Sequence, residues 1–276
     1  MSATRRRQSA RRSPAALLLV ASAFGAPLSL AAQASPPRGP VLKTRDLVTL
    51  GAAAAGAGLL APFDTRIARW SQQPRLHRSR AVNTVAAGLR AFGDPGVAIL
   101  GATTYGVGLL ADRRATAAVG LHTVGAIAAG GLVTTAIKVG VGRARPYVTH
   151  DSAAFDVGFG RGLRGGNAYQ SFPSGHATAA FAFAGALAAE GRYRWRDVNR
   201  VTGPAGFAVA GLVAASRVYH DRHWASDVVA GAGIGAVAGA AVVRYTRSHP
   251  ENAIDRRLLP RRAVAPTPVV SWTVRF

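Results

Sequence analysis

The 276-residue chain contains no cysteine, and its acidic residues are few. Without cysteine there is no disulfide framework and no thiol chemistry, which suits an exported protein without requiring export. The 12 Asp and Glu face 34 Lys and Arg, giving a net charge of +22. Such an excess points to nucleic acid, an anionic lipid surface or a phosphorylated substrate as partner. The arginines are scattered among Ala- and Gly-rich apolar runs, and no nucleic-acid module is present, so we expect no nucleic-acid partner.

The N-terminal segment has the pattern of a secretory signal peptide over residues 1–34. Five arginines between Arg5 and Arg12 precede an apolar stretch at 15–32, and Ala32-Gln33-Ala34 resembles a cleavage site. An uncleaved membrane anchor is the alternative. The remaining chain divides by composition into a linker with packing helices at 35–92, a core domain at 93–247 and a basic tail at 248–276.

The core has no strand alternation, so we expect an all-α protein. Apolar helices are predicted at 95–111, 115–139, 175–190, 204–218 and 224–246, with the Arg-rich segment 191–203 as a separator. We expect a bundle of about six core helices, with the apolar stretch 47–62 lying at the membrane interface or packing on the bundle. Residues 147–172 are a Gly-rich irregular loop, and long loops of this sort are often functional.

Two flanking segments have patterns of their own. Residues 64–90 are amphipathic, and five of their apolar side chains are expected to pack on the core: Ile67, Trp70, Val82, Val85 and Leu89. Residues 270–276 alternate apolar and polar side chains, which predicts a short strand-like tail.

Several apolar segments are long enough, or nearly so, to cross about 30 Å of hydrocarbon. Mean hydropathy is only +0.15, so a soluble bundle stays an alternative to the membrane-embedded one that we favour. The Arg-rich segments 112–114, 191–203 and the tail after residue 247 lie on one side, as cytoplasmic loops do. We therefore expect a cell-envelope protein whose functional side faces the periplasm. If the signal peptide is cleaved, this orientation requires that residues 47–62 do not span.

Residues 216–227 read SRVYHDRHWASD and contain a histidine and an aspartate four residues apart. A helix that begins near Trp224 places His223 and Asp227 on one face. A carboxylate held against one ring nitrogen fixes the tautomer and leaves the other nitrogen free to attack. Arg217 adds a planar fork of donors for an oxyanion such as phosphate. A surface His–Asp pair is the alternative.

Residues 138–146 read KVGVGRARP, with Lys138 and Arg145 two helical turns apart. A solvated helix end is the alternative to an anion site. Lys138 argues against it, because this residue borders a long apolar run in a chain whose only other lysine is Lys43.

Residues 171–177 read SFPSGHA, and Pro173 suits the first turn of a helix. Ser174 and the amide of Gly175 would then lie at the positive end of that helix, where anions bind. His176 falls in the same turn, where it could protonate a leaving alkoxide. Phosphoryl transfer needs cations, a nucleophile and a proton donor, and the three segments supply all of them.

In this order, the patterns K-x6-R-P, P-S-G-H and S-R-x5-H-x3-D closely resemble the signature of the type 2 phosphatidic acid phosphatase and haloperoxidase superfamily. Every signature position is matched, over roughly residues 90–245. The resemblance implies that His223 attacks phosphorus and forms a phosphohistidine, that Asp227 orients it and that His176 is the general acid. It implies no metal or other cofactor and a phosphate held by six residues: Lys138, Arg145, Ser174, Gly175, His176 and Arg217.

The activity that the resemblance implies is a phosphatase for a phosphate monoester or diphosphate, of a lipid or of a small ester. The scarcity of acids near the motifs, with no metal-ligand spacing, is consistent with metal-free chemistry. A soluble periplasmic acid phosphatase, a vanadate-dependent haloperoxidase and a non-catalytic envelope protein stay as alternatives. Within the motifs, His220 lacks a carboxylate four residues on and is not expected to be the nucleophile. In the loop, His150, Arg161 and Arg164 are expected to face water.

Overall fold

The computed structural model describes residues 40–260, which form helices and loops without a β-strand. The predicted all-α class is therefore confirmed. The predicted signal peptide and the strand-like pattern at 270–276 lie outside the described residues.

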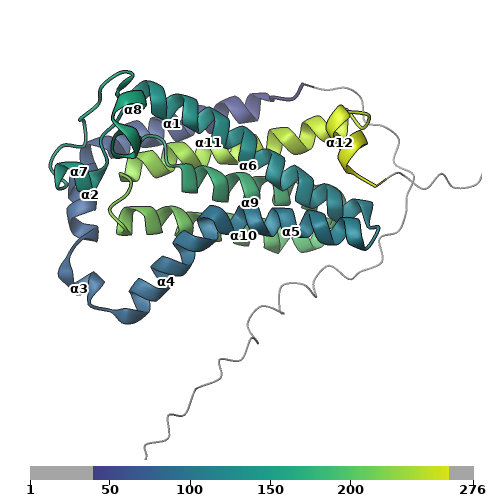
Figure 1. Ribbon diagram of the computed structural model, residues 1–276, viewed down its shortest axis with the longest axis horizontal. Helices are drawn as coiled ribbons and strands as arrows, with labels where there is room; N and C mark the ends of the chain where they lie inside the picture. Colours follow the sequence, from purple (N-terminus) through teal and green to yellow (C-terminus); the bar gives the residue numbers. More distant parts are fainter. Residues whose placement is uncertain (1–39, 261–276) are drawn as a thin grey trace, which may run out of the picture. The chain divides into compact units, whose positions relative to one another are not determined.

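Six long helices make the bundle, as the sequence predicts (Figure 1). They are α1 (Thr44–Leu60), α5 (Val97–Leu110), α6 (Arg114–Val141), α9 (Gly175–Arg194), α10 (Arg196–Tyr219) and α11 (Ala225–Ser248). The other elements are short: η2 (Ala61–Phe63), α2 (Asp64–Ser71), α3 (Pro74–His77), α4 (Arg80–Ala91), η3 (Phe92–Gly96), α7 (Pro146–Thr149), α8 (Arg161–Arg164), η4 (Gly166–Tyr169) and α12 (Ala253–Leu258).

Helix α9 lies at the centre of the bundle and packs against α6, α10 and α11. Its contact with α11 is close because glycines recur every fourth residue of α11, on one face. A Cβ at Gly231, Gly235 or Gly239 would lie within 2.5 Å of a backbone oxygen of α9. Small residues at such a seam let two backbones approach, which is typical of helix pairs in membranes.

One predicted loop is helical. The Arg-rich segment 191–203 was expected to separate two helices, but α9 continues to Arg194 and α10 already begins at Arg196. Pro204, the first residue of the predicted helix 204–218, lies inside α10. The charged side chains do not end the helices, because a helix can continue where its arginines face solvent. Arg192, Arg196 and Arg200 are all exposed.

Four helical segments are long and apolar enough to cross a membrane: 44–71, 114–141, 196–219 and 225–248. They support the expectation of a membrane protein. Residues 47–62, which were expected not to span, lie within the first of these candidate segments, and that expectation stays a prediction. Arg244 near the end of α11 contacts Val41 and Asp46, and Ser226 at its start contacts Asp64. The segment from α1 to α2 therefore runs antiparallel to α11 over the whole length of α11.

Helices α2, α3 and α4 leave the bundle between α1 and η3 and return to it (Figure 1). Trp70, Val82 and Val85, which were expected to be buried, are 54%, 41% and 61% exposed. The small side chains Ala68 and Ala86 are buried instead. Because these short helices lie away from the core, the rest of residues 40–260 covers their apolar side chains only in part.

Candidate active site

The three sequence motifs meet at one end of the bundle. Lys138, in the last turn of α6, donates from Nζ to the carbonyl of Gln170 at 2.5 Å. The backbone N–H of Ser174, at the N-cap of α9, donates to the carbonyl of Asp227 at 2.9 Å. The guanidinium of Arg145 donates to the carbonyl of Arg222 at 3.1 Å. Each motif thus contacts another, and the end of α6, the start of α9 and the start of α11 surround one site.

A tight turn at Gly142 ends α6 in the middle of the first motif, residues 138–146. Gly142 ends the helix with φ of +59°, a left-handed conformation that favours glycine. A Cβ at this position would lie 2.2 Å from the carbonyl oxygen of Gly158. The chain therefore folds back against the loop 147–172, and Arg143 and Arg145 point into the site rather than along the helix.

His223 is buried, with a side-chain exposure of 2%, and its Nδ1 lies 2.8 Å from the carbonyl oxygen of Ser171. A carbonyl only accepts hydrogen bonds, so Nδ1 must carry the proton. The lone pair then resides on Nε2, which is the form required of a nucleophile. Burial lowers the pKa of His223 to about 3, so the ring is neutral at pH 7.

Asp227 lies 3.5 Å from Nδ1 of His223, farther than the carbonyl of Ser171. Its carboxylate is held by the hydroxyl of Ser171 at 2.5 Å and by the backbone N–H of Trp224 at 2.9 Å. The second contact caps α11, which begins where the sequence predicts. Asp227 thus fixes both Ser171 and the start of α11, and these in turn hold the imidazole.

Arg143 was not singled out in the sequence, yet it joins two buried carboxylates. It donates to Asp227 at 2.6 Å and to Asp64 at 2.7 Å, and it also bonds Ser226 at 2.8 Å. Both aspartates have 0% side-chain exposure. Asp64 belongs to α2, far from the motifs in sequence, so nothing local predicted this contact. The one available signal was a third basic residue inside the first motif.

Of the cations predicted to hold phosphate, Arg145 and Arg217 are buried and Lys138 is half-buried, and they differ in how completely they are paired. Arg145 is fixed by Asn167, with Nε donating to its carbonyl at 2.7 Å. Arg217 is buried, and its Nε and Nη1 have no hydrogen-bond partner within residues 40–260. Unpaired buried guanidinium donors are costly unless an oxyanion satisfies them. The N-terminus of α9, with Ser174 and Gly175, adds a positive helix end.

His176 lies in the first turn of α9, where its Nδ1 is 3.8 Å from Oδ2 of Asp94. Burial lowers the pKa of His176 and so do the charges of four nearby cations, so that it is about 3; the cations are Arg217, Arg145, Arg90 and Lys138. Two negative groups could oppose these cations: a bound phosphate and the Asp94 carboxylate. The sequence reasoning missed Asp94, which sits in η3 beside Gly93. The backbone at Gly93 lies close to both Val213 and His176, since a Cβ there would be 2.3 Å from Val213 and 3.7 Å from His176. A side chain at this position would therefore clash with Val213.

The remaining candidates of the sequence analysis lie around the site in other roles. Nδ1 of His220 contacts the carbonyl of Ser216 at 2.6 Å, within its own helix end. Arg161, which was expected to face water, instead bonds the carbonyl of Gly142 at 3.0 Å and Asp156 at 2.8 Å. It therefore fastens the loop to the turn that follows α6. Among residues 40–260, no group of three or more His, Asp or Glu could hold a metal ion.

Fold and site together define a helical, membrane-type bundle with an anion site and a neutral histidine at one end. Residues 120–250 match the model of the PAP2 superfamily. The matched region contains all three motifs, and the match is to the superfamily that these motifs predict.

Three curated relatives are each named lipid A 1-phosphatase. The protein from Porphyromonas gingivalis is 42% identical over 83 residues, which cover 29% of this chain and 17% of that protein. The protein from Rhizobium johnstonii is 37% identical over 107 residues, covering 38% of this chain and 39% of that one. The protein from Rhizobium etli is 34% identical over 118 residues, covering 42% and 46%. The chain thus spans less than half the length of each relative.

A solved structure shares the fold. The transmembrane PAP2-type phosphatidylglycerolphosphate phosphatase from Bacillus subtilis superposes with a TM-score of 0.54 over 72% of this chain and 92% of that one. At 21% sequence identity, this likeness supports the helical membrane fold and says nothing of the substrate.

Proposed function

We propose that this protein is a metal-independent phosphatase that removes phosphate from a lipid through a phosphohistidine on His223. The observation that carries the proposal is the buried guanidinium of Arg217, which has two unpaired donors in a site with a neutral imidazole. Such an arrangement suits an oxyanion next to a nucleophile. A cation site without a nucleophile would serve binding alone.

In the first half-reaction, Nε2 of His223 attacks phosphorus and forms an N–P bond while the bond to the ester oxygen breaks. Lys138, Arg145 and Arg217 neutralise the equatorial oxygens, as phosphoryl transfer requires. His176 gives its proton to the leaving oxygen and becomes neutral. The carbonyl of Ser171 retains the proton on Nδ1, so the phosphorylated ring stays in one orientation.

In the second half-reaction, a water molecule attacks phosphorus and the N–P bond breaks. His176 now accepts the proton of that water, which returns both histidines to their starting states. Before substrate binds, the cations around His176 keep its pKa low. A phosphate dianion offsets those charges, so proton uptake by His176 is coupled to substrate binding.

For the substrate, the names of the relatives make lipid A the first compound to assay, and phosphatidylglycerol phosphate the second. Phosphatidate, a polyprenyl diphosphate and p-nitrophenyl phosphate complete the panel. We expect phosphate release from a lipid to exceed that from the soluble ester, and no release by His223→Ala. A preference for the soluble ester would favour the acid-phosphatase alternative.

Two additions test the chemistry. Activity should survive EDTA, and loss of activity on chelation would count against a metal-free site. Vanadate, a phosphate mimic, should inhibit phosphate release. Bromide oxidation in the presence of vanadate and peroxide would instead support the haloperoxidase alternative.

For orientation, we propose that the active site faces the periplasm. The Arg-rich segments 113–114, 192–200 and 256–257 lie at the opposite end of the bundle and are typical of cytoplasmic loops. Because α1 runs along the whole of α11, Lys43 must then lie on the cytoplasmic side, so this orientation requires that residues 1–34 do not carry the chain across the membrane. The chain has no cysteine, so single cysteines report topology directly. Ser79→Cys should react with an impermeant maleimide from the periplasm and Ala115→Cys should not; the reverse labelling would overturn the orientation.

A further inference from the structure

The segment of residues 61–92, here called the arm, comprises η2, α2, α3 and α4 and joins two long helices at the active-site end. Ser71 and Gln72 each lie 3.3 Å from the carbonyl of Val218, near the end of α10. Tyr219, one residue on, stacks on His77 with ring centroids 4.4 Å apart. Asp64 bonds Arg143 in the site itself. The arm is therefore fixed to the active site and is not a loose loop.

The charge of the arm is of one sign at its surface. Its only acidic residue is Asp64, which is fully buried and bound to Arg143. All of its arginines are exposed and have no hydrogen bond or ion pair with the rest of residues 40–260: Arg66, Arg69, Arg75, Arg78, Arg80 and Arg90. Six exposed cations thus have no counter-charge from the described protein.

Apolar side chains accompany these cations. Phe63, Trp70, Val82 and Val85 are between 41% and 61% exposed. Short helices that expose arginines together with aromatic or aliphatic side chains are typical of the membrane interface. Trp is favoured there, because its ring is apolar and its N–H is polar.

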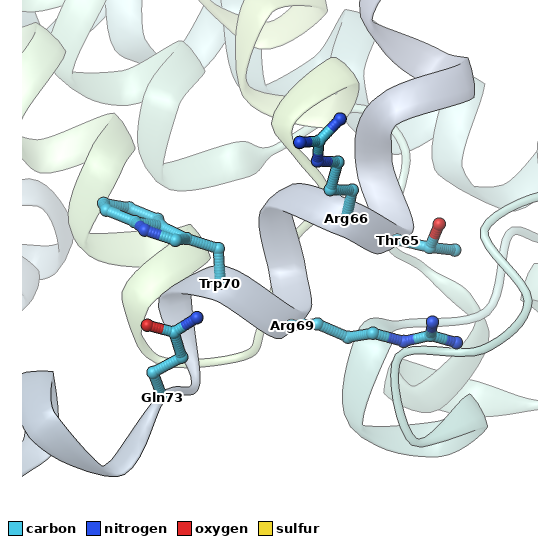
Figure 2. Close-up of a pocket in the computed structure, with 5 residues that line it drawn as sticks. All are labelled: Thr65, Arg66, Arg69, Trp70 and Gln73. Atoms are coloured by element: carbon cyan, nitrogen blue, oxygen red, sulfur yellow. The ribbon is translucent and has the colours of Figure 1, made fainter.

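One face of α2 forms a surface cavity of about 390 Å³. Figure 2 shows its lining, with the two arginines, Trp70 and Gln73 all projecting from α2 and the residues that follow it. The volume lies within the range of small-ligand sites, roughly 300–1,000 Å³. Arg66 and Arg69 are three residues apart, so their guanidinium groups come from adjacent positions on one helix. Figure 2 shows the two guanidinium groups pointing to different sides of α2, so each offers its donors to a lipid phosphate separately.

We propose that the arm is a second, non-catalytic lipid site, in which Arg66 and Arg69 each bind a phosphate headgroup of the anionic phospholipids around it while Trp70 enters the interface. The occupant is a lipid of the bilayer leaflet that the active site faces. Charge complementarity supports this choice, because the exposed surface of the arm is cationic and apolar together. The site holds α2 and α4 at headgroup depth, next to the end of α10 that carries Arg217.

The fluorescence of Trp70 provides a test that does not depend on turnover. The full chain is placed in phosphatidylcholine nanodiscs that contain either brominated phosphatidylglycerol or brominated phosphatidylcholine at the same mole fraction. The Trp70 signal is the difference between wild type and Trp70→Phe, because both proteins share the other three tryptophans, Trp195, Trp224 and Trp272. We expect stronger quenching by the anionic lipid, and a loss of that preference at high salt.

The double variant Arg66→Gln/Arg69→Gln should lower the preference for phosphatidylglycerol. Each arginine near an anionic surface contributes about 1 kcal/mol, so two substitutions reduce the preference by up to about 30-fold. The matched control is Arg256→Gln/Arg257→Gln, which removes the same charge from exposed positions on α12 and should change nothing. Equal quenching by both lipids in wild type, or an unchanged preference in the arm variant, would overturn the proposal. Hydrolysis of p-nitrophenyl phosphate, measured in parallel, reports separately on the catalytic proposal.

Discussion

Removal of Arg143 is expected to destabilise the protein more than any other single change of an arginine in the site. Arg143 is the partner of Asp64 at 2.7 Å and of Asp227 at 2.6 Å, and both carboxylates are fully buried. Arg143→Met keeps most of the volume and removes the charge. Two buried carboxylates then face each other across the site without a cation.

The magnitude follows from the number of orphaned charges. Breaking a buried ion pair by removing one partner costs about 3–5 kcal/mol, because the other charge stays buried. Here one substitution breaks two pairs, so we expect the upper part of that range. With about 2–4 °C per kcal/mol for a chain of this size, the unfolding temperature should fall by roughly 10 °C or more.

The assay is thermal unfolding of purified protein in detergent, with two companion variants. Arg200→Met removes an exposed pair with Asp197 at 3.3 Å and should leave the unfolding temperature unchanged. Arg143→Met/Asp64→Asn removes one of the two orphaned charges and should recover part of the loss. An unfolding temperature of Arg143→Met equal to that of wild type would refute the reasoning.

Three further outcomes are expected. His220→Ala should retain substantial phosphatase activity while His223→Ala has none; the opposite pattern in a phosphate-release assay would exchange their roles. Asp94→Asn should reduce turnover at high pH more than at low pH, because the loss of this carboxylate lowers the pKa of His176 further; a pH–rate profile of unchanged shape would deny Asp94 that role. The pKa of His223 is about 3 in the folded protein and about 6.5 when unfolded, so the unfolded state binds the extra proton. Stability should therefore fall as pH drops from about 6.5 towards 3, and less so in His223→Gln; identical pH dependence of unfolding in both proteins would contradict the burial argument.

Local spacing was sufficient to predict most of the long helices and the positions of the three motifs along them. The four-residue separation of His223 and Asp227 and the Pro-Ser start of α9 each follow from rules that act within a few residues. Motif spacing also placed Lys138 and Arg145 on the same site, because a helix end and a turn join them.

Contacts between distant segments were not predictable in the same way. Asp64 reaches Arg143 only because α2 packs across the start of α11, and Asp94 reaches His176 only because η3 lies beside α9. The apolar positions Trp70 and Val85 misled for a related reason. Periodicity tells which face of a helix is apolar, but not whether protein or lipid covers that face.

The most direct measurement of the central claim is the isolation of the phosphorylated enzyme. His176→Ala is mixed with p-nitrophenyl phosphate, whose leaving group needs little protonation, and the reaction is stopped in alkali. Without His176 to activate water, the phosphoenzyme should accumulate, and peptide mass spectrometry should find phosphate on His223. Phosphate on another residue, or turnover with no phosphorylated protein at any time, would contradict the account.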